Sequence, residues 1–152
     1  MIAAVQRVLN ADVKIDGKVY SSIGKGLLVL LGIKKGDTEN EADYIAKKLT
    51  DLRIFNDENE KMNLSIKDIQ GEIMLISQFT LCADTKKSGN RPSFSDAEDP
   101  ERAEFLYEKT KSELINLYSP EKIKCGVFAA MMEISLVNSG PVTILIEKSF
   151  NE

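Results

Sequence analysis

Polar side chains follow directly on an apolar run near the middle of this 152-residue chain. Residues 72–78 have the composition of a buried strand, and its end turns polar at Ser77, Gln78, Phe79 and Thr80. Hydroxyl and amide groups at the end of a buried strand commonly line the pocket of an α/β protein, where they hydrogen-bond a substrate. These four residues are a candidate substrate site, although a strand end with a satisfied hydroxyl has the same composition.

A second polar segment, Asn138-Ser139-Gly140-Pro141-Val142-Thr143, lies between strands predicted at 132–137 and 142–147. Asn, Gly and Pro are the residues that turns prefer, so an ordinary turn is the simpler interpretation. A functional loop has the same composition, and the segment alone leaves both interpretations open.

The chain contains no histidine, and this excludes several kinds of chemistry. Ser-His-Asp and Cys-His triads, HExxH zinc sites and an imidazole base all require one. The two cysteines, Cys82 and Cys125, lie far apart in the sequence, so neither a Cys₄ nor a Cys₂His₂ zinc site can form. We expect both thiols to pack as small apolar side chains.

Phosphate-binding loops and metal clusters are also missing from the sequence. It contains neither a GxxxxGK[ST] loop nor a GxGxxG turn. The acidic clusters at 57–60 and 96–99 are interpreted as charges of a solvated loop and of a helix start rather than as metal ligands. We therefore expect no metal and no cofactor.

The net charge of the chain indicates which kinds of partner to expect. Twenty basic and 24 acidic residues give a net charge of −4, so no long-range attraction draws the chain to RNA or to a membrane. Any RNA contact must depend on a local patch, and residues 84–95 supply Lys86, Lys87 and Arg91 against Asp84. The N-terminus lacks the apolar core of a signal peptide, and no window reaches the length of a membrane span, so we expect a cytoplasmic protein.

Local signals predict the elements that position these residues. Asp16-Gly17 between β-forming residues predicts a tight hairpin, because both positions of a type I′ turn need positive φ. Strands are predicted at 2–9 and at 27–33. Thr38 and Glu41 form a capping box before apolar residues at helical spacing, which predicts a helix over 38–52.

The second half of the chain adds one helix and three strands. Asp99-Pro100 supplies an N-cap and a first helical residue, and Ser119-Pro120 ends this second helix. Strands are predicted at 123–128, 132–137 and 142–147. The order β-β-β-α-β-α-β-β-β predicts one mixed α/β domain spanning residues 1–152, with a mixed, barrel-like sheet and two helices on one side.

Taken together, SQFTL at 77–81 and NSGPVT at 138–143 closely resemble the two signature motifs of the D-aminoacyl-tRNA deacylase family. Arg7, the segment 89–94 (GNRPSF) and Met132-Glu133 agree with the same family. The likeness extends over the whole chain, and the order and separation of the motifs agree as well.

The resemblance implies a homodimeric cytoplasmic enzyme that hydrolyses the ester between a D-amino acid and the terminal ribose of tRNA, with glycyl-tRNA as a second candidate substrate. It implies a catalytic ester site lined by Ser77, Gln78, Phe79 and Thr80, and a substrate pocket that includes Phe94 and Asn138. It also implies that Gly140-Pro141, with a cis peptide bond, enters the partner's pocket and screens chirality, and that Arg7 anchors this segment.

Without histidine, neither Ser77 nor Thr80 has an obvious base, so we expect both to orient the ester rather than attack it. Aminoacyl esters are reactive, and the neighbouring ribose hydroxyl of the tRNA can assist a metal-free reaction. Two alternatives remain open at this point: a non-catalytic RNA- or protein-binding module, and a hydrolase of small esters or amides.

Overall fold

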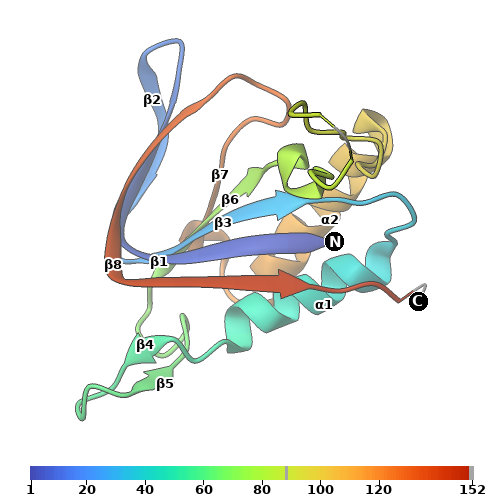
Figure 1. Ribbon diagram of the computed structural model, residues 1–152. Coiled ribbons are helices and arrows are strands. Elements are labelled where there is room, and N and C mark those ends of the chain that lie inside the picture. Colours follow the sequence, from blue (N-terminus) through green and yellow to red (C-terminus); the bar gives the residue numbers. More distant parts are fainter. Residues whose placement is uncertain (88, 151–152) are drawn as a thin grey trace.

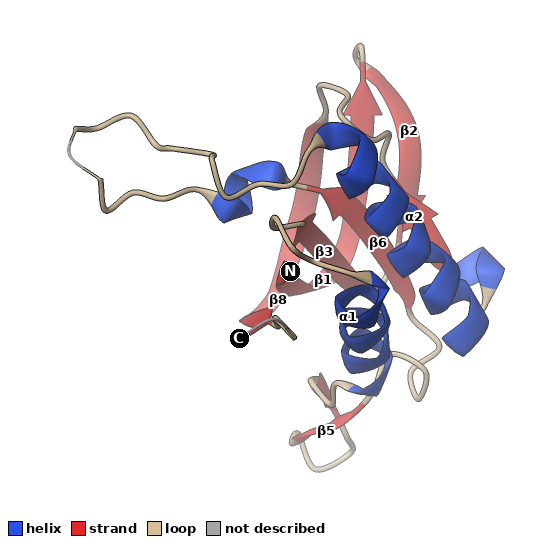
Figure 2. Cartoon of the chain, turned by 90° about the vertical axis from the view of Figure 1, so that its right-hand side faces the viewer, coloured by secondary structure: helices blue, strands red, loops and turns tan. Residues whose placement is uncertain are grey.

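Within residues 1–87 and 89–150, which the computed structural model describes, a six-stranded sheet carries two helices on one face (Figures 1 and 2). Ser88 of the basic segment, and residues 151 and 152 of the expected domain, lie outside this range. The elements in chain order are β1 (Ile2–Ile15), β2 (Lys18–Ile23), β3 (Gly26–Gly32), α1 (Glu39–Asp51), β4 (Phe55–Asn56), β5 (Met62–Leu64), β6 (Glu72–Ser77), the 3₁₀ helix η1 (Phe79–Cys82), α2 (Pro100–Leu117), the 3₁₀ helix η2 (Pro120–Lys122), β7 (Ile123–Cys125) and β8 (Glu133–Glu147).

The sheet is mixed, as the element order predicts. Its order is β2-β1-β3-β6-β7, and β8 pairs with β1. β3, β6 and β7 run parallel because a helix lies in each connection between them, whereas β2, β3 and β8 all run antiparallel to β1. The far half of β1 curls away together with β2 and the first half of β8, which gives the sheet its barrel-like shape (Figure 1).

Two apolar clusters hold these layers together. The larger lies between the sheet and the helices, where Ile45 and Leu49 of α1 and Leu106 of α2 cover Val29 and Leu75. The smaller lies inside the curl and includes Val8, Ala11, Val13, Leu28, Met74 and Ile76. β3 and β6 are therefore buried on both faces, which explains why their sequences are continuous apolar runs.

The local signals at Asp16-Gly17 and at Thr38 are confirmed. Asp16 and Gly17 have φ of 52° and 77°, as a type I′ turn between β1 and β2 requires. The Thr38 side chain accepts a hydrogen bond from the amide of Asn40, and the Glu41 carboxylate accepts one from the amide of Thr38. At the second helix Asp99 occupies the N-cap position, but its side chain makes no capping bond.

The strands predicted at 132–137 and 142–147 are wrong as separate elements, because a single strand, β8, runs from Glu133 to Glu147. β1 is long enough to pair with its whole length, so the polar segment between them is a bulge within one strand rather than a turn. The predicted strand 123–128 ends already at Cys125, and the first strand extends from the predicted 2–9 to Ile15.

The small hairpin formed by β4 and β5 was not predicted, because its strands are too short to show a period-two pattern. Its turn explains the acidic cluster at 57–60. The Asp57 carboxylate accepts hydrogen bonds from the amides of Asn59 and Lys61, at 2.8 and 3.1 Å. Asp57 therefore closes a turn, which agrees with the interpretation as a loop charge.

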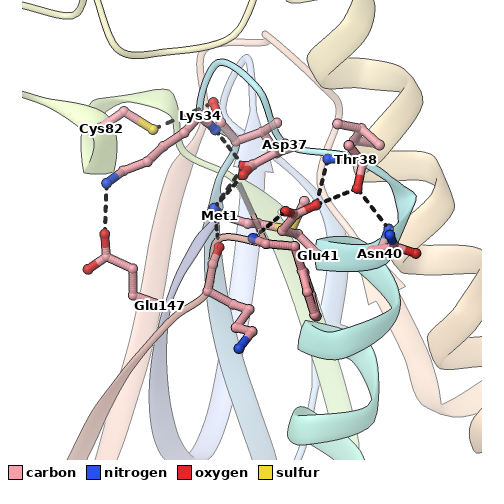
Figure 3. A network of polar contacts seen from close by, with 12 residues as sticks. Met1, Lys34, Asp37, Thr38, Asn40, Glu41, Cys82 and Glu147 are labelled. Atoms are coloured by element: carbon pink, nitrogen blue, oxygen red, sulfur yellow. Dashed lines mark hydrogen bonds and ion pairs between the residues drawn. The ribbon is translucent and has the colours of Figure 1, made fainter. Parts of the chain in front are cut away.

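A polar network ties both ends of the chain to the connection between β3 and α1 (Figure 3). The N-terminal ammonium of Met1 donates to the Asp37 carboxylate at 2.8 Å, and that carboxylate also accepts from the Lys34 amide. Next to it the carbonyl of Ile33 accepts from the Cys82 thiol at 3.6 Å and from the Glu98 amide at 2.9 Å. These bonds fix the segment that follows β3, which forms part of the pocket described below.

Glu41 is the fully buried centre of the same network. Its carboxylate accepts from both the amide and the hydroxyl of Thr38, and from the amide of Phe150 at 2.8 Å. Burial raises the pKa of Glu41, but these hydrogen bonds lower it more, to about 2. Because this pKa lies below its ordinary value of 4.5, ionised Glu41 stabilises the fold above pH 4.5 and loses that contribution as the pH falls toward 2.

We expect Glu41→Gln to lower the free energy of unfolding by about 3 kcal/mol at pH 7, since a carboxyl pKa of about 2 in place of 4.5 is worth about that much. The difference from wild type shrinks as the pH approaches 2. Urea unfolding at several pH values measures it. Glu39→Gln, an exposed change in the same helical turn, is the matched control. A difference between Glu41→Gln and wild type that does not change with pH would contradict the assignment.

Candidate active site

A pocket of about 650 Å³ opens where β3 and β6 end. Its walls are mostly apolar and come from three parts of the chain: the ends of these strands with η1, the start of α2, and the segment between β7 and β8. The lining residues are Leu31, Ile33, Ile76, Ser77, Gln78, Phe79, Ala97, Glu98, Pro100, Ala103, Phe128, Ala129, Ala130, Met131, Met132 and Ile134. The pocket therefore lies at the sheet edge where the sequence placed a candidate site.

Ser77, Gln78 and Phe79 line this pocket because β6 ends at Ser77 and the chain turns at once into η1. The side-chain amide of Gln78 donates a hydrogen bond through Nε2 to the Thr80 hydroxyl at 2.6 Å. The hydroxyl oxygen is thereby held in place, and its own proton stays available for a substrate oxygen. No described residue accepts a hydrogen bond from the Thr80 hydroxyl and so stands ready to take its proton, and this geometry suits orientation rather than nucleophilic attack.

Phe94 packs edge-on against Phe79, with ring centroids 5.2 Å apart. Both rings are partly exposed, by 39% and 58%, and Phe79 forms the pocket wall. Phe94 thus lies beside the pocket rather than among its lining residues. Thr80 is also exposed next to the lining residues, so these two side chains border the mouth of the pocket.

Neither cysteine is placed as a nucleophile. Burial raises the pKa of the Cys82 thiol, and its sulfur faces the backbone carbonyl of Ile33. Burial also raises the pKa of Cys125, which lies in β7 away from the pocket lining. Both thiols stay protonated at neutral pH, in agreement with their expected packing role.

The polar segment at 138–143 forms a bulge opposite Arg7. Gln6 pairs with Thr143 and Val8 pairs with Asn138, so residues 139–142 of β8 face the single residue Arg7 of β1. The buried guanidinium of Arg7 fills this gap, and its Nε donates to the Ser139 carbonyl at 3.0 Å. Burying the Arg7 charge would be costly on its own, and here the guanidinium provides a hydrogen bond to a backbone carbonyl of the bulge.

The other side of the Arg7 guanidinium binds the start of the β4–β5 hairpin. Its Nη1 donates to the Ile54 carbonyl at 2.8 Å and to the Asn56 side chain at 3.2 Å. These partners were missed by sequence reasoning, since they belong to a hairpin without a clear strand pattern. Arg7 therefore holds the bulge in a fixed position relative to the body of the domain.

Gly140 and Pro141 are joined by a cis peptide bond and are both exposed. Gly140 has a φ of +124°, and a Cβ on it would lie 2.9 Å from Nη2 of Arg7. Only glycine combines this conformation with so close an approach of the guanidinium. The geometry of the bulge and the position of Arg7 therefore depend on each other.

Within one chain, the bulge and the pocket lie apart. Leu31 pairs with both Ser77 and Ala3, so the pocket end of β6 is level with Ala3, whereas the bulge is level with Arg7. The offset along β1 is about 13 Å, and β8 lies three strands from β6, which adds about 14 Å across the sheet. The bulge is thus roughly 20 Å from the pocket of its own chain. Asn138, at the edge of the bulge, likewise does not line that pocket.

No group of three or more Asp, Glu or Cys side chains is arranged to hold a metal ion in the part of the chain that the structure describes. Nor is any helix in that part long and apolar enough to cross a membrane. The available chemistry is that of hydroxyls, an amide, the acidic residue Glu98 and backbone groups around a mostly apolar pocket.

The model of the D-Tyr-tRNA(Tyr) deacylase family matches residues 4–147, and the chain belongs to this family. A D-aminoacyl-tRNA deacylase of Persephonella marina is 54% identical over 147 residues, which cover 97% of both chains. One of Syntrophus aciditrophicus is 52% identical over 149 residues, again covering 97% of each.

Solved structures show the same fold. The c-Myc DNA Unwinding Element Binding Protein superimposes with a TM-score of 0.92 at 43% identity, covering 98% of this chain and 99% of the other. A probable eukaryotic D-amino acid tRNA deacylase superimposes with a TM-score of 0.78 over 95% of this chain and 97% of the other. At 14% identity, the second likeness establishes the fold alone.

Proposed function

We propose that this chain hydrolyses the ester bond of D-aminoacyl-tRNA in the cytoplasm and releases the free D-amino acid and tRNA. Family membership over nearly the whole chain is the observation that carries the proposal. The site supports it, because a mostly apolar pocket bordered by hydroxyl and amide groups, with one acidic residue, Glu98, in its lining, suits an aminoacyl ester.

In the proposed reaction, water attacks the ester carbonyl and the bond to the ribose oxygen breaks. Ser77, Gln78 and Thr80 hold the ester, and the Thr80 proton stabilises the carbonyl oxygen as negative charge develops on it. The ribose hydroxyl next to the ester assists the attack, since the protein offers no imidazole base. Position and hydrogen bonding supply the rate enhancement, without a metal and without a covalent intermediate.

The active enzyme in this proposal is a homodimer in which each chain places Gly140-Pro141 in its partner's pocket. Three features support the exchange: the bulge cannot reach its own pocket, it is exposed, and it lies on β8, which pairs only with β1 among the described strands. Val137 and Leu145 on the same strand are 46% and 67% exposed, and Met131 at the pocket is 89% exposed. An apolar edge strand of this length needs a cover.

The dimer gives the bulge its role in chiral selection. Backbone atoms held by Arg7 form a rigid surface, which can crowd one face of the substrate's α-carbon. Two-fold symmetry brings the same bulge and pocket together twice, so that each chain completes the other's site. Phe94 and Asn138 border the combined site in this arrangement.

We expect the wild-type protein to release D-amino acid from tRNA at the same rate with and without EDTA, because residues 1–87 and 89–150 provide no cluster of metal ligands. The amount of aminoacyl ester that remains at successive times gives this rate. An activity that is lost in EDTA and restored by zinc would contradict the metal-free mechanism. Tight binding of tRNA with no loss of the ester would contradict the proposed function itself.

A further inference from the structure

The segment between η1 and α2 leaves the body of the domain as a long loop, which projects well away from the sheet (Figure 2). We define its residues 84–95 as the arm. At its base Asp84 and Ser93 exchange two backbone hydrogen bonds, at 2.8 and 3.0 Å. The two sides of the arm are thereby held together where they leave the domain, and the arm projects from a fixed base.

The arm is strongly basic, although the chain as a whole is acidic. It contains Lys86, Lys87 and Arg91, all exposed, in a protein whose net charge is −4. None of the three forms a salt bridge with any residue that the structure describes. Asp84 is the acidic residue of the arm, and its carboxylate accepts a hydrogen bond from the backbone amide of Lys86 at 2.8 Å. These cations are therefore available to an anionic partner.

The base of the arm adjoins the mouth of the pocket. Phe94 packs on Phe79, and Phe79 is part of the pocket wall. When the 3′ end of a polynucleotide is bound in the pocket, the nucleotides that precede it must pass through this mouth. The sugar-phosphate backbone next to the ester then passes close to the base of the arm.

We propose that the arm is a phosphate-binding element that holds the acceptor end of tRNA beside the pocket through Lys86, Lys87 and Arg91. This inference rests on the proposed function and adds a division of labour to it. The pocket binds the aminoacyl end, whereas the arm binds the negatively charged sugar-phosphate backbone. Contacts of this kind are independent of nucleotide sequence and weaken steeply with salt.

The test is the triple variant Lys86→Ala, Lys87→Ala, Arg91→Ala, assayed on D-aminoacyl-tRNA and on D-aminoacyl-adenosine, which carries the ester but no phosphate. For tRNA we expect kcat/KM to fall about tenfold at 50 mM salt, through a higher KM. We also expect the plot of log KM against log salt to become less steep by about 2 to 3, because each lost phosphate contact removes about one unit. For D-aminoacyl-adenosine we expect kcat/KM to change less than twofold.

Lys47→Ala is the control for the loss of a lysine outside the arm, because Lys47 is exposed on α1 and its surface ion pair with Asp51, at 2.8 Å, contributes little to stability. It should leave both substrates unaffected. Direct binding of uncharged tRNA at several salt concentrations gives the same slopes without any catalysis, so a failure of the proposed function does not hide the result. Unchanged slopes in the triple variant, or an equal loss with both substrates, would overturn the role of the arm.

Discussion

Thr80→Ala should lower the rate of D-aminoacyl-tRNA hydrolysis by about 10²–10³-fold without abolishing it. The change removes the hydroxyl that Gln78 holds at 2.6 Å, and with it the proton that stabilises the developing oxyanion. The pocket, the ribose hydroxyl and the other hydrogen-bonding groups remain, so residual activity is expected. Single-turnover kinetics with saturating enzyme measure the chemical step directly.

Thr80→Ser is the matched control, because it restores the hydroxyl and should recover most of the rate. The variant side chain is exposed, so a loss of folding is not expected to contribute. Rapid acid quenching of the wild type, followed by mass determination, should show only the free protein. A covalent aminoacyl adduct on Thr80 or Ser77 would contradict the orienting role and assign nucleophilic attack to that hydroxyl.

Arg7→Ala should lower the ratio of D to L hydrolysis by roughly 10- to 100-fold, because each hydrogen bond to a charged group is worth about 1.5–3 kcal/mol. The variant loses the bond to Ser139 that positions the bulge, and the two bonds through which Arg7 itself is held by Ile54 and Asn56. The hydrolysis of D-aminoacyl-tRNA should change less than that of the L form. Parallel assays with both enantiomers on the same tRNA give the ratio.

Arg7→Lys keeps the positive charge but loses the arrangement of hydrogen bonds, since an ammonium group cannot reproduce the several bonds that the planar guanidinium makes. It should therefore lose most of the discrimination as well. Arg53→Ala, a neighbouring exposed arginine that donates to the Asn63 carbonyl, should keep the wild-type ratio. Light scattering checks that each variant is a dimer. A wild type that is monomeric and still discriminates would contradict the exchange of bulges between chains.

The parts of the fold that sequence predicted correctly depend on short-range chemistry. The hairpin at Asp16-Gly17 and the capping box at Thr38 are each decided by two neighbouring residue types, and both are present in the structure. The apolar runs at 27–33 and 73–76 predict strands because burial on both faces leaves few polar positions. Ser77 and Gln78, at the polar end of the second strand, line the pocket.

The parts that sequence missed depend on partners far along the chain. Asn138–Pro141 has the composition of a turn, yet β1 is long enough to pair with residues on both sides of it, so the segment becomes a bulge. Nothing near Arg7 in the sequence indicates that its guanidinium reaches Ile54 or Ser139. The pocket wall at 128–134 was not predicted for the same reason, because an apolar segment that follows a short strand has the composition of a continued strand.

The central claim is that the chain removes D-amino acids from tRNA and spares their L counterparts. It is tested most directly by charging one tRNA separately with D- and L-tyrosine, adding wild-type protein in the presence of EDTA, and following the remaining ester with time. The account predicts rapid loss of the D ester, while the L ester decays no faster than it does without protein. Equal loss of both esters, or loss of neither, would contradict it.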